Sequence, residues 1–186
     1  IEDLKDTRWC LATEISGNII KVMDFVGNGN NHSSTSVITI YKKINAVLNS
    51  IDRLEVRGRD SSGISIMFIL AREEYKKFKA WIDGYKGRTN LSELLNERMG
   101  KKTLVNKSIS IRDSENDGGD KLTAITFTYK IAAEIGSLGD NINFLRWEIK
   151  NDPIFKGLIS YPAEFYTISA HTRWASVGEI SEPNCH

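Results

Sequence analysis

The chain has 186 residues, enough for one domain that buries a hydrophobic core. Its 25 basic and 24 acidic residues nearly cancel, so the composition excludes a strong field that would recruit nucleic acid or an anionic membrane. No window of eighteen apolar residues occurs, and the two cysteines, Cys10 and Cys185, have neither a disulfide framework nor a metal-binding spacing. We therefore expect a cytoplasmic protein with no cofactor, no metal and no nucleic-acid or membrane partner.

The first half of the chain predicts two amphipathic helices and a buried strand. Apolar residues recur at helical spacing over residues 1–27, where a break is expected near Gly17, and again over residues 37–54. The continuous apolar run Ile64–Ala71 is typical of a central strand covered on both faces. Cys10 lies beside the first apolar stripe with no neighbour that would activate its thiol, so we expect it to be buried and unreactive rather than a nucleophile.

The second half predicts two polar helices, a hairpin, a further helix and a last strand. The two helices occupy residues 72–99, and Asn90 is placed to cap the second of them. Alternating segments on either side of the acidic turn 113–120 favour a hairpin; a calcium loop is the alternative, but the spacing does not fit an EF-hand. Residues 138–152 predict a helix that ends before a proline, and residues 164–174 a strand. Together these elements favour an α+β fold, with helices covering a mostly antiparallel sheet.

Two stretches carry side chains suited to chemistry. In Ala170–His186, Arg173 is surrounded by hydrogen-bonding side chains and could bind a carboxylate through a bidentate fork. The alternative is that Arg173 pairs with a structural carboxylate and Trp174 fills the core. In Asp52–Ile66, Arg57 and several small polar residues occupy the junction between a predicted helix and a predicted strand.

Three short segments in these stretches match one known pattern. Residues 53–63 read Arg-Leu-Glu-Val-Arg-Gly-Arg-Asp-Ser-Ser-Gly, residues 171–178 read His-Thr-Arg-Trp-Ala-Ser-Val-Gly, and residues 181–186 read Ser-Glu-Pro-Asn-Cys-His. In this order they resemble the glutaminase domain of the glucosamine-6-phosphate synthase family. That domain is a type II glutamine amidotransferase of the N-terminal-nucleophile hydrolase fold. The match covers a small part of the chain, in three ordered pieces.

The resemblance implies a four-layer αββα sandwich, with a helical and hairpin insertion at about residues 71–120. It implies that residues 1–186 are part of a longer type 2 glutamine amidotransferase domain. The nucleophile of such a domain is an amino-terminal cysteine whose own α-amine serves as the base, and we expect it upstream of Ile1. A synthase or sugar-isomerase domain is expected downstream of His186.

The resemblance assigns three residues to glutamine binding. Arg173 matches the arginine that clamps the α-carboxylate of glutamine, which orients the side-chain amide for attack. Ser176 stands where the family has a threonine that contacts substrate. Trp174 matches the tryptophan of a loop that closes over the site and separates ammonia from bulk water. Val177 occupies a position where relatives often carry a histidine, so that contact is missing.

Further residues are assigned to catalysis and support. Arg57 matches the arginine beside the nucleophile, where a fixed positive charge favours thiolate over thiol. Asp60 is expected to hold the turn around Arg57 through hydrogen bonds, and His171 and Thr172 are expected to support the site. Cys185 replaces a small residue of the family pattern, and the resemblance gives it no role.

The activity implied by the resemblance is hydrolysis of glutamine to glutamate and ammonia. The ammonia would pass to a sugar phosphate such as fructose 6-phosphate, held by the downstream domain. The expected partners are therefore glutamine, a sugar phosphate and, in a homo-oligomer, further copies of the chain. Two alternatives remain: a non-catalytic module that keeps the fold for assembly or binding, and an amide hydrolase of the same fold that does not transfer ammonia.

Overall fold

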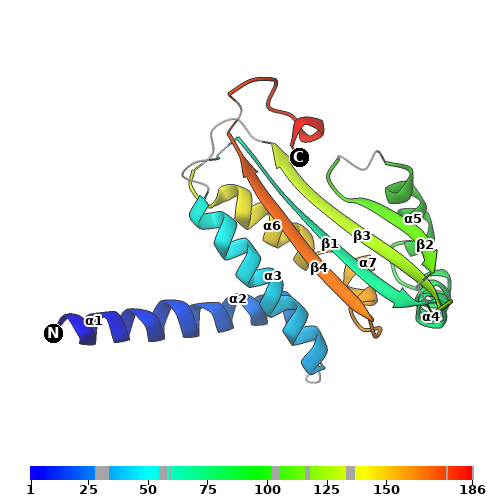
Figure 1. Cartoon of the computed structure of the whole chain (residues 1–186), viewed down its shortest axis with the longest axis horizontal. Helices are drawn as coiled ribbons and strands as arrows, with labels where there is room; N and C mark the ends of the chain where they lie inside the picture. Colours follow the sequence, from blue (N-terminus) through cyan, green and yellow to red (C-terminus); the bar gives the residue numbers. More distant parts are fainter. Residues whose placement is uncertain are drawn as a thin grey trace. The chain divides into compact units, whose positions relative to one another are not determined.

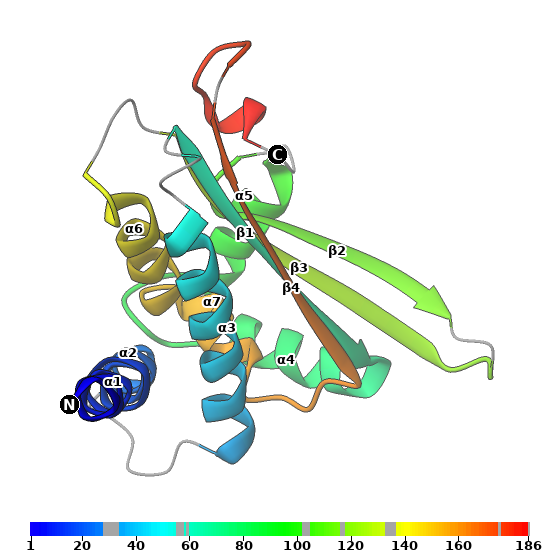
Figure 2. The same ribbon diagram turned by 60° about the vertical axis from the view of Figure 1, so that its left-hand side comes forward.

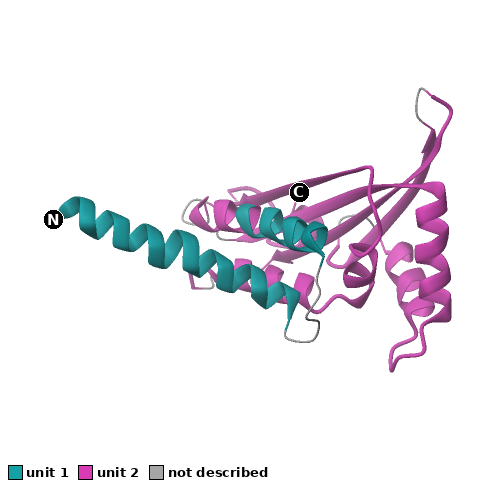
Figure 3. Cartoon of the chain, turned by 90° about the horizontal axis from the view of Figure 1, so that it is seen from below, with its two compact units in different colours: residues 1–46 teal, residues 47–186 magenta. Residues whose placement is uncertain are grey.

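A computed structural model describes residues 1–27, 34–54, 58, 60–101, 105–115, 118–132, 137–174 and 176–185 of the chain (Figure 1). The chain divides into two compact units, Ile1–Ala46 and Val47–His186, coloured teal and magenta in Figure 3. Within the described ranges, no helix is both long enough and apolar enough to cross a membrane.

The first unit is helical. It contains α1 (Glu2–Trp9), the π-helix η1 (Cys10–Ser16), α2 (Gly17–Val26) and the beginning of α3 (Thr35–Leu54). The ring of Phe25 stacks on that of Tyr41 with 5.2 Å between centroids, and Asn45 Nδ2 donates to Asn18 Oδ1 at 2.9 Å, so α2 packs against α3. The predicted helix over residues 1–27 is confirmed. The predicted break near Gly17 is wrong, because the helix continues there after a π-helical stretch.

The thiol of Cys10 is exposed, so the expectation that it is buried is wrong. No residue of α1 or η1 is buried, whereas Val22 and Phe25 of α2 are buried. The apolar period correctly predicted a helix with an apolar face. The period could not predict which part of this face other residues cover. Among the described residues, only the last turns of α2 are covered.

The second unit is built on a four-stranded sheet. Its strands are β1 (Ser61–Ala71), β2 (Ser108–Glu115), β3 (Lys121–Ala132) and β4 (Phe165–Arg173), in the order β2-β3-β1-β4, with each neighbouring pair antiparallel. The unit also contains α4 (Arg72–Gly84), α5 (Leu91–Gly100), α6 (Asp140–Lys150), α7 (Pro153–Leu158) and the short η3 (Glu182–Asn184). The predicted α+β class is therefore confirmed. The residues expected to form an insertion, 71–120, supply α4, α5 and β2 to this same unit.

The central strand β1 buries one face more completely than the other. Ile66 and Phe68 are almost fully buried, whereas Met67 between them is half-buried. The buried face is covered by α7, whose Phe155 ring lies 5.9 Å from that of Phe68 and 5.3 Å from that of Phe127 on β3. Figure 2 shows α6 and α7 on the same side of the sheet. The expectation that β1 is covered on both faces is corrected accordingly: one face is buried and the other is half-buried over Ser65–Ala71.

The acidic turn belongs to a hairpin, as the sequence predicts. Strands β2 and β3 are its two arms, and Glu115 pairs with Lys121 at its end. The Asp113 carboxylate forms an ion pair with Arg72 at 2.6 Å and accepts a hydrogen bond from Thr123 Oγ1 at 2.9 Å. This carboxylate therefore joins the hairpin to the start of α4. Residues 116 and 117 lie outside the described part of the chain.

Side-chain caps begin two helices of the second unit, α5 and α7. Asn90 Oδ1 accepts from Glu93 N at 3.2 Å, which confirms the predicted cap of α5. Asp152 Oδ1 accepts from the first N–H groups of α7. The helix α6 begins at Asp140 without a side-chain cap, and the Asp140 carboxylate accepts from Ser137 N instead.

A buried charge network joins the helices to β3. Arg98 Nη1 contacts Asp152 Oδ2 at 2.7 Å, and Tyr129 Oη donates to the same oxygen at 2.6 Å. Arg98 Nε donates to the carbonyl of Lys107 at 2.7 Å, and the ammonium of Lys107 lies 2.7 Å from Glu148 Oε2. Burial, together with the nearby Asp152 carboxylate, raises the pKa of Tyr129 well above its ordinary value, so this hydroxyl remains a donor.

Candidate functional site

The first two motif segments meet where β1 begins and β4 ends. Ser61 pairs with Arg173 and Gly63 with His171 in the antiparallel ladder, and Asp60 N donates to Arg173 O at 3.1 Å. Gly58 lies so close to β4 that an added Cβ would be 2.8 Å from Thr172 Oγ1. Two segments that are far apart in sequence are thus joined by backbone pairing.

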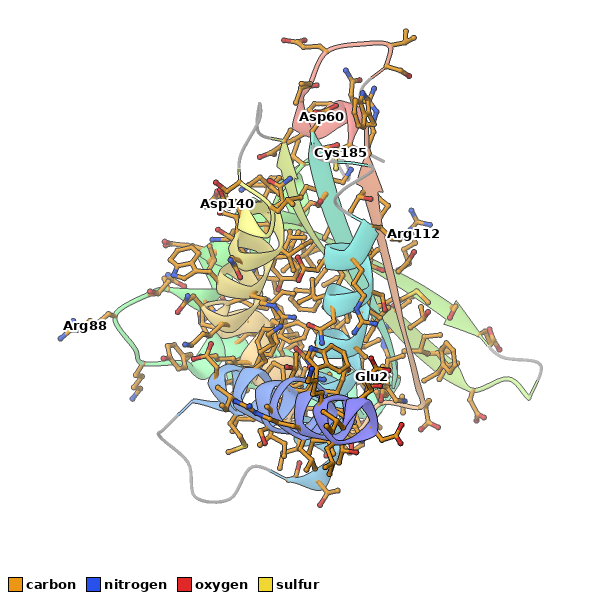
Figure 4. The ribbon with its side chains drawn as sticks, turned by 90° about the vertical axis from the view of Figure 1, so that its left-hand side faces the viewer. Glu2, Asp60, Arg88, Arg112, Asp140 and Cys185 are labelled. Carbon is orange, nitrogen blue, oxygen red and sulfur yellow. The ribbon has the colours of Figure 1, made fainter. Side chains whose placement is uncertain are left out.

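The third motif segment lies on the same end of the sheet. Figure 4 labels Asp60 and Cys185 at this end. Cys185 is fully buried, and its Sγ lies 3.1 Å from His171 Nε2. The ammonium of Lys130 donates to the carbonyl oxygen of Cys185. The third segment is therefore held to β4 through its thiol and to β3 through its backbone.

Strand register explains why these groups converge. Lys130, Gly63 and His171 are aligned across β3, β1 and β4, and directly paired residues project to the same face of a sheet. A Cβ on Gly63 would lie 2.6 Å from His171 Cε1, so the imidazole occupies the space that a side chain at this position would need. The absence of a side chain at Gly63 lets the imidazole lie in the middle of this row.

Arg173 is the last residue of β4, and its guanidinium contacts the loop that follows the strand. Its Nη2 donates to Val177 O at 2.8 Å, and Gly178 turns the chain there with a φ of 89°. Its Nη1 is shielded from solvent and has no hydrogen-bond partner among the described residues. An unpartnered, shielded N–H group is costly, and an anionic oxygen is the acceptor that best satisfies a guanidinium.

The alternative reading of this loop is not supported. Trp174 is 63 % exposed, so it does not fill the core. Within the described ranges, Arg173 forms no ion pair with a carboxylate. Ser176 is exposed, and its N–H donates to Trp174 O at 3.0 Å.

The predicted site residues are thus only partly brought together. Arg173, Thr172, His171 and the backbone of Asp60 lie at one end of the sheet, while the side chains of Trp174 and Ser176 are exposed in the adjoining loop. Arg57 falls outside the described residues, so its predicted role stays a prediction.

Sequence reasoning gave no role to Lys130 or Cys185. Lys130 lies in a strand of alternating polar and apolar residues, and the local pattern does not distinguish it from a solvent-facing lysine. Its pairing with Gly63 of β1 is what places it in the site. Burial lowers the pKa of the Lys130 ammonium and raises the pKa of the Cys185 thiol. A buried thiol with a raised pKa is a poor nucleophile, so Cys185 serves here as a hydrogen-bonding and packing group.

Replacing Cys185 with alanine is expected to loosen residues 176–185. The change removes the contact to His171 and leaves a small cavity, at a cost of about 1–2 kcal/mol. Amide hydrogen exchange in this segment should therefore become about tenfold faster. The matched control is Cys10→Ala, which removes the exposed thiol and should leave exchange in residues 176–185 unchanged. Equal exchange in both variants would show that the thiol contact does not hold the segment.

Comparison of the chain with protein-family models, with curated proteins and with solved structures gave no match.

Proposed function

We propose that this chain is the glutaminase part of a glutamine-dependent amidotransferase. The observation that carries the proposal is the meeting of all three motif segments at one end of the sheet, around Arg173. The first segment ends at Gly63 and is brought to the second only by the pairing of β1 with β4, whereas the third follows the second after two residues. A site inherited as a unit accounts for both the three patterns and their convergence.

In this proposal Arg173 binds the α-carboxylate of glutamine. Its Nη1 lacks an acceptor among the described residues, and its Nη2 is oriented by the Val177 carbonyl. Holding the charged end of the substrate fixes the position of the side-chain amide, which is the reacting group. Thr172 and His171 support the strand end from which the guanidinium projects, and Trp174 and Ser176 form the loop that closes over the bound substrate.

The reaction is amide hydrolysis through a thioester. The thiol of an amino-terminal cysteine adds to the side-chain amide carbon of glutamine, and its own α-amine accepts the thiol proton. The carbon–nitrogen bond then breaks, the departing nitrogen takes a proton and leaves as ammonia, and water hydrolyses the glutamyl thioester to glutamate. Arg57 is proposed to favour the thiolate by its positive charge.

The finer assignments follow from the same proposal. The sheet of the second unit would be one layer of a four-layer αββα sandwich of the N-terminal-nucleophile hydrolase type. The ammonia would pass to a sugar phosphate such as fructose 6-phosphate on a further domain. The cytoplasm, where glutamine and sugar phosphates are available, is the proposed location.

The test is a glutaminase assay on the protein with its natural termini. We expect glutamate release from glutamine, and loss of that release after treatment with a glutamine-analogue alkylator. Mass spectrometry should place the label on an amino-terminal cysteine. The variant Cys10→Ala should be labelled and inactivated equally, which separates specific labelling from reaction at the exposed thiol. Absence of both glutamate release and label would favour the non-catalytic binding module.

A further inference from the structure

The loop that follows Arg173 is anchored at both of its ends. At one end, the pairing of β4 with β1 fixes Arg173 itself. At the other end, η3 lies beside the end of β3 (Figure 1), where the Lys130 ammonium donates to the carbonyl oxygen of Cys185. Asn184 Nδ2 also donates to Glu179 O at 3.1 Å, which ties η3 to the preceding part of the loop.

A residue from outside the three motif segments joins η3 to the sheet. Asn106 N donates to Glu182 Oε2 at 3.0 Å, and Asn106 Oδ1 accepts from Lys130 N at 3.0 Å. Glu182 belongs to the third motif segment, whereas Asn106 belongs to the stretch 71–120 that was expected to be an insertion. Asn106 therefore bridges η3 and β3 through its own backbone and side chain.

The register of the hairpin explains the position of Asn106. At this end of the ladder Ser108 pairs with Thr128, and the same register continued by two residues would place Asn106 opposite Lys130. The strand β2 begins only at Ser108, and the side-chain oxygen of Asn106 supplies the acceptor that a strand carbonyl would otherwise supply. The backbone N–H of Asn106 is consequently available to Glu182.

The backbone next to Asn106 is held in an uncommon conformation. Lys107 has a φ of 60°, in the left-handed region that residues other than glycine seldom adopt. Arg98 Nε donates to the Lys107 carbonyl at 2.7 Å. The Lys107 ammonium lies 2.7 Å from Glu148 Oε2 and 5.8 Å from the centre of the Trp147 ring. Such a conformation persists only where its surroundings hold it, and it is frequent at functional sites. These contacts fix the point from which Asn106 reaches η3.

We propose that Asn106 is a positioning residue for glutamine binding: it holds η3 on β3 and thereby fixes the loop between Arg173 and η3. Val177 O in this loop accepts from Arg173 Nη2 at 2.8 Å, so a displaced loop would misdirect the guanidinium. Asn106 acts through η3 and does not itself contact the substrate. The inference rests on the proposed glutaminase function and extends it, because it gives the stretch 71–120 a part in substrate binding.

Steady-state glutaminase kinetics on the protein with its natural termini test this role. We expect Asn106→Ala to raise KM for glutamine about tenfold and to change kcat by less than about twofold, because the loop orients the charged end of the substrate and not the reacting cysteine. The matched control is Asn96→Ala, which makes the same change at an exposed position of α5 in the same stretch. It should leave both constants unchanged.

Two variants of Glu182 test the other end of the bridge. Glu182→Ala removes the acceptor of Asn106 N and should raise KM about as much as Asn106→Ala does. Glu182→Gln keeps an oxygen acceptor in this position and should recover most of the wild-type affinity. The double variant of Asn106→Ala with Glu182→Ala should raise KM little beyond either single variant, because both changes break the same bridge.

Amide hydrogen exchange gives a second measurement that does not depend on activity. In Asn106→Ala the amides of residues 179–185 should exchange about tenfold faster, while those of β1 should keep their rates. An active wild type whose KM is unchanged by Asn106→Ala overturns the inference and leaves the proposed function in place. A raised KM without faster exchange also overturns it, because η3 is then not what Asn106 holds. A wild type that releases no glutamate overturns the proposed function and the positioning role together.

Discussion

Replacing Asp152 with alanine is expected to lower the free energy of unfolding by about 3–5 kcal/mol, because it strands a buried cation. The Asp152 carboxylate contacts Arg98 Nη1 at 2.7 Å and accepts from Tyr129 Oη at 2.6 Å. It also accepts from the N–H groups of Ile154 and Phe155 at 3.0 and 3.1 Å. Arg98 is 2 % exposed, so without Asp152 its guanidinium cannot reach bulk water.

Chemical denaturation measured by circular dichroism gives the change in unfolding free energy. The matched control is Asp113→Ala, which removes an exposed carboxylate from its ion pair with Arg72 and should have a small effect. A double replacement, Asp152→Leu with Arg98→Met, should recover part of the lost stability, because it removes the cation together with its partner. If Asp152→Ala and Asp113→Ala destabilise equally, the buried network does not contribute as proposed.

The local sequence pattern predicted most of the helices and strands. It predicted few of the contacts between them. The cap at Asn90 and the arms of the hairpin around residues 113–120 depend on residues close in sequence, and the structure confirms both. The exposure of Cys10 depends on what covers its face of the helix, and no period in the sequence contains that information. The prediction for strand β1 failed for a related reason: Met67 and Ile69 are as apolar as residues of a buried face but remain half-buried.

The candidate site was predicted as a set of residues but not as an arrangement. The resemblance pointed to Arg173, His171 and Asp60, yet only the pairing of β1 with β4 places them together. That pairing joins residues more than a hundred positions apart, so its register follows from the whole sheet. Lys130 enters the site by the same register across β3, without a signal in its own segment.

Replacing Arg173 with alanine is expected to reduce kcat/KM for glutamine about 100-fold, mainly by raising KM. The guanidinium is proposed to bind the α-carboxylate through a charge-assisted fork, and loss of such a contact costs about 3 kcal/mol. Its backbone carbonyl, which accepts from Asp60 N, remains in the variant, so the strand end should stay in place. Steady-state glutaminase kinetics on the protein with its natural termini measure the effect.

Two comparisons separate a carboxylate clamp from a general effect of charge. Arg112→Ala removes an exposed arginine from β2, far along the sheet order from β4, and should leave KM unchanged. Arg173→Lys keeps the charge but loses the fork, so it should recover only part of the activity. A glutamine analogue whose α-carboxylate is replaced by an uncharged amide should be hydrolysed equally poorly by wild type and Arg173→Ala. If the variant instead loses the same factor with both substrates, Arg173 supports the loop through its bond to Val177 O rather than binding the carboxylate.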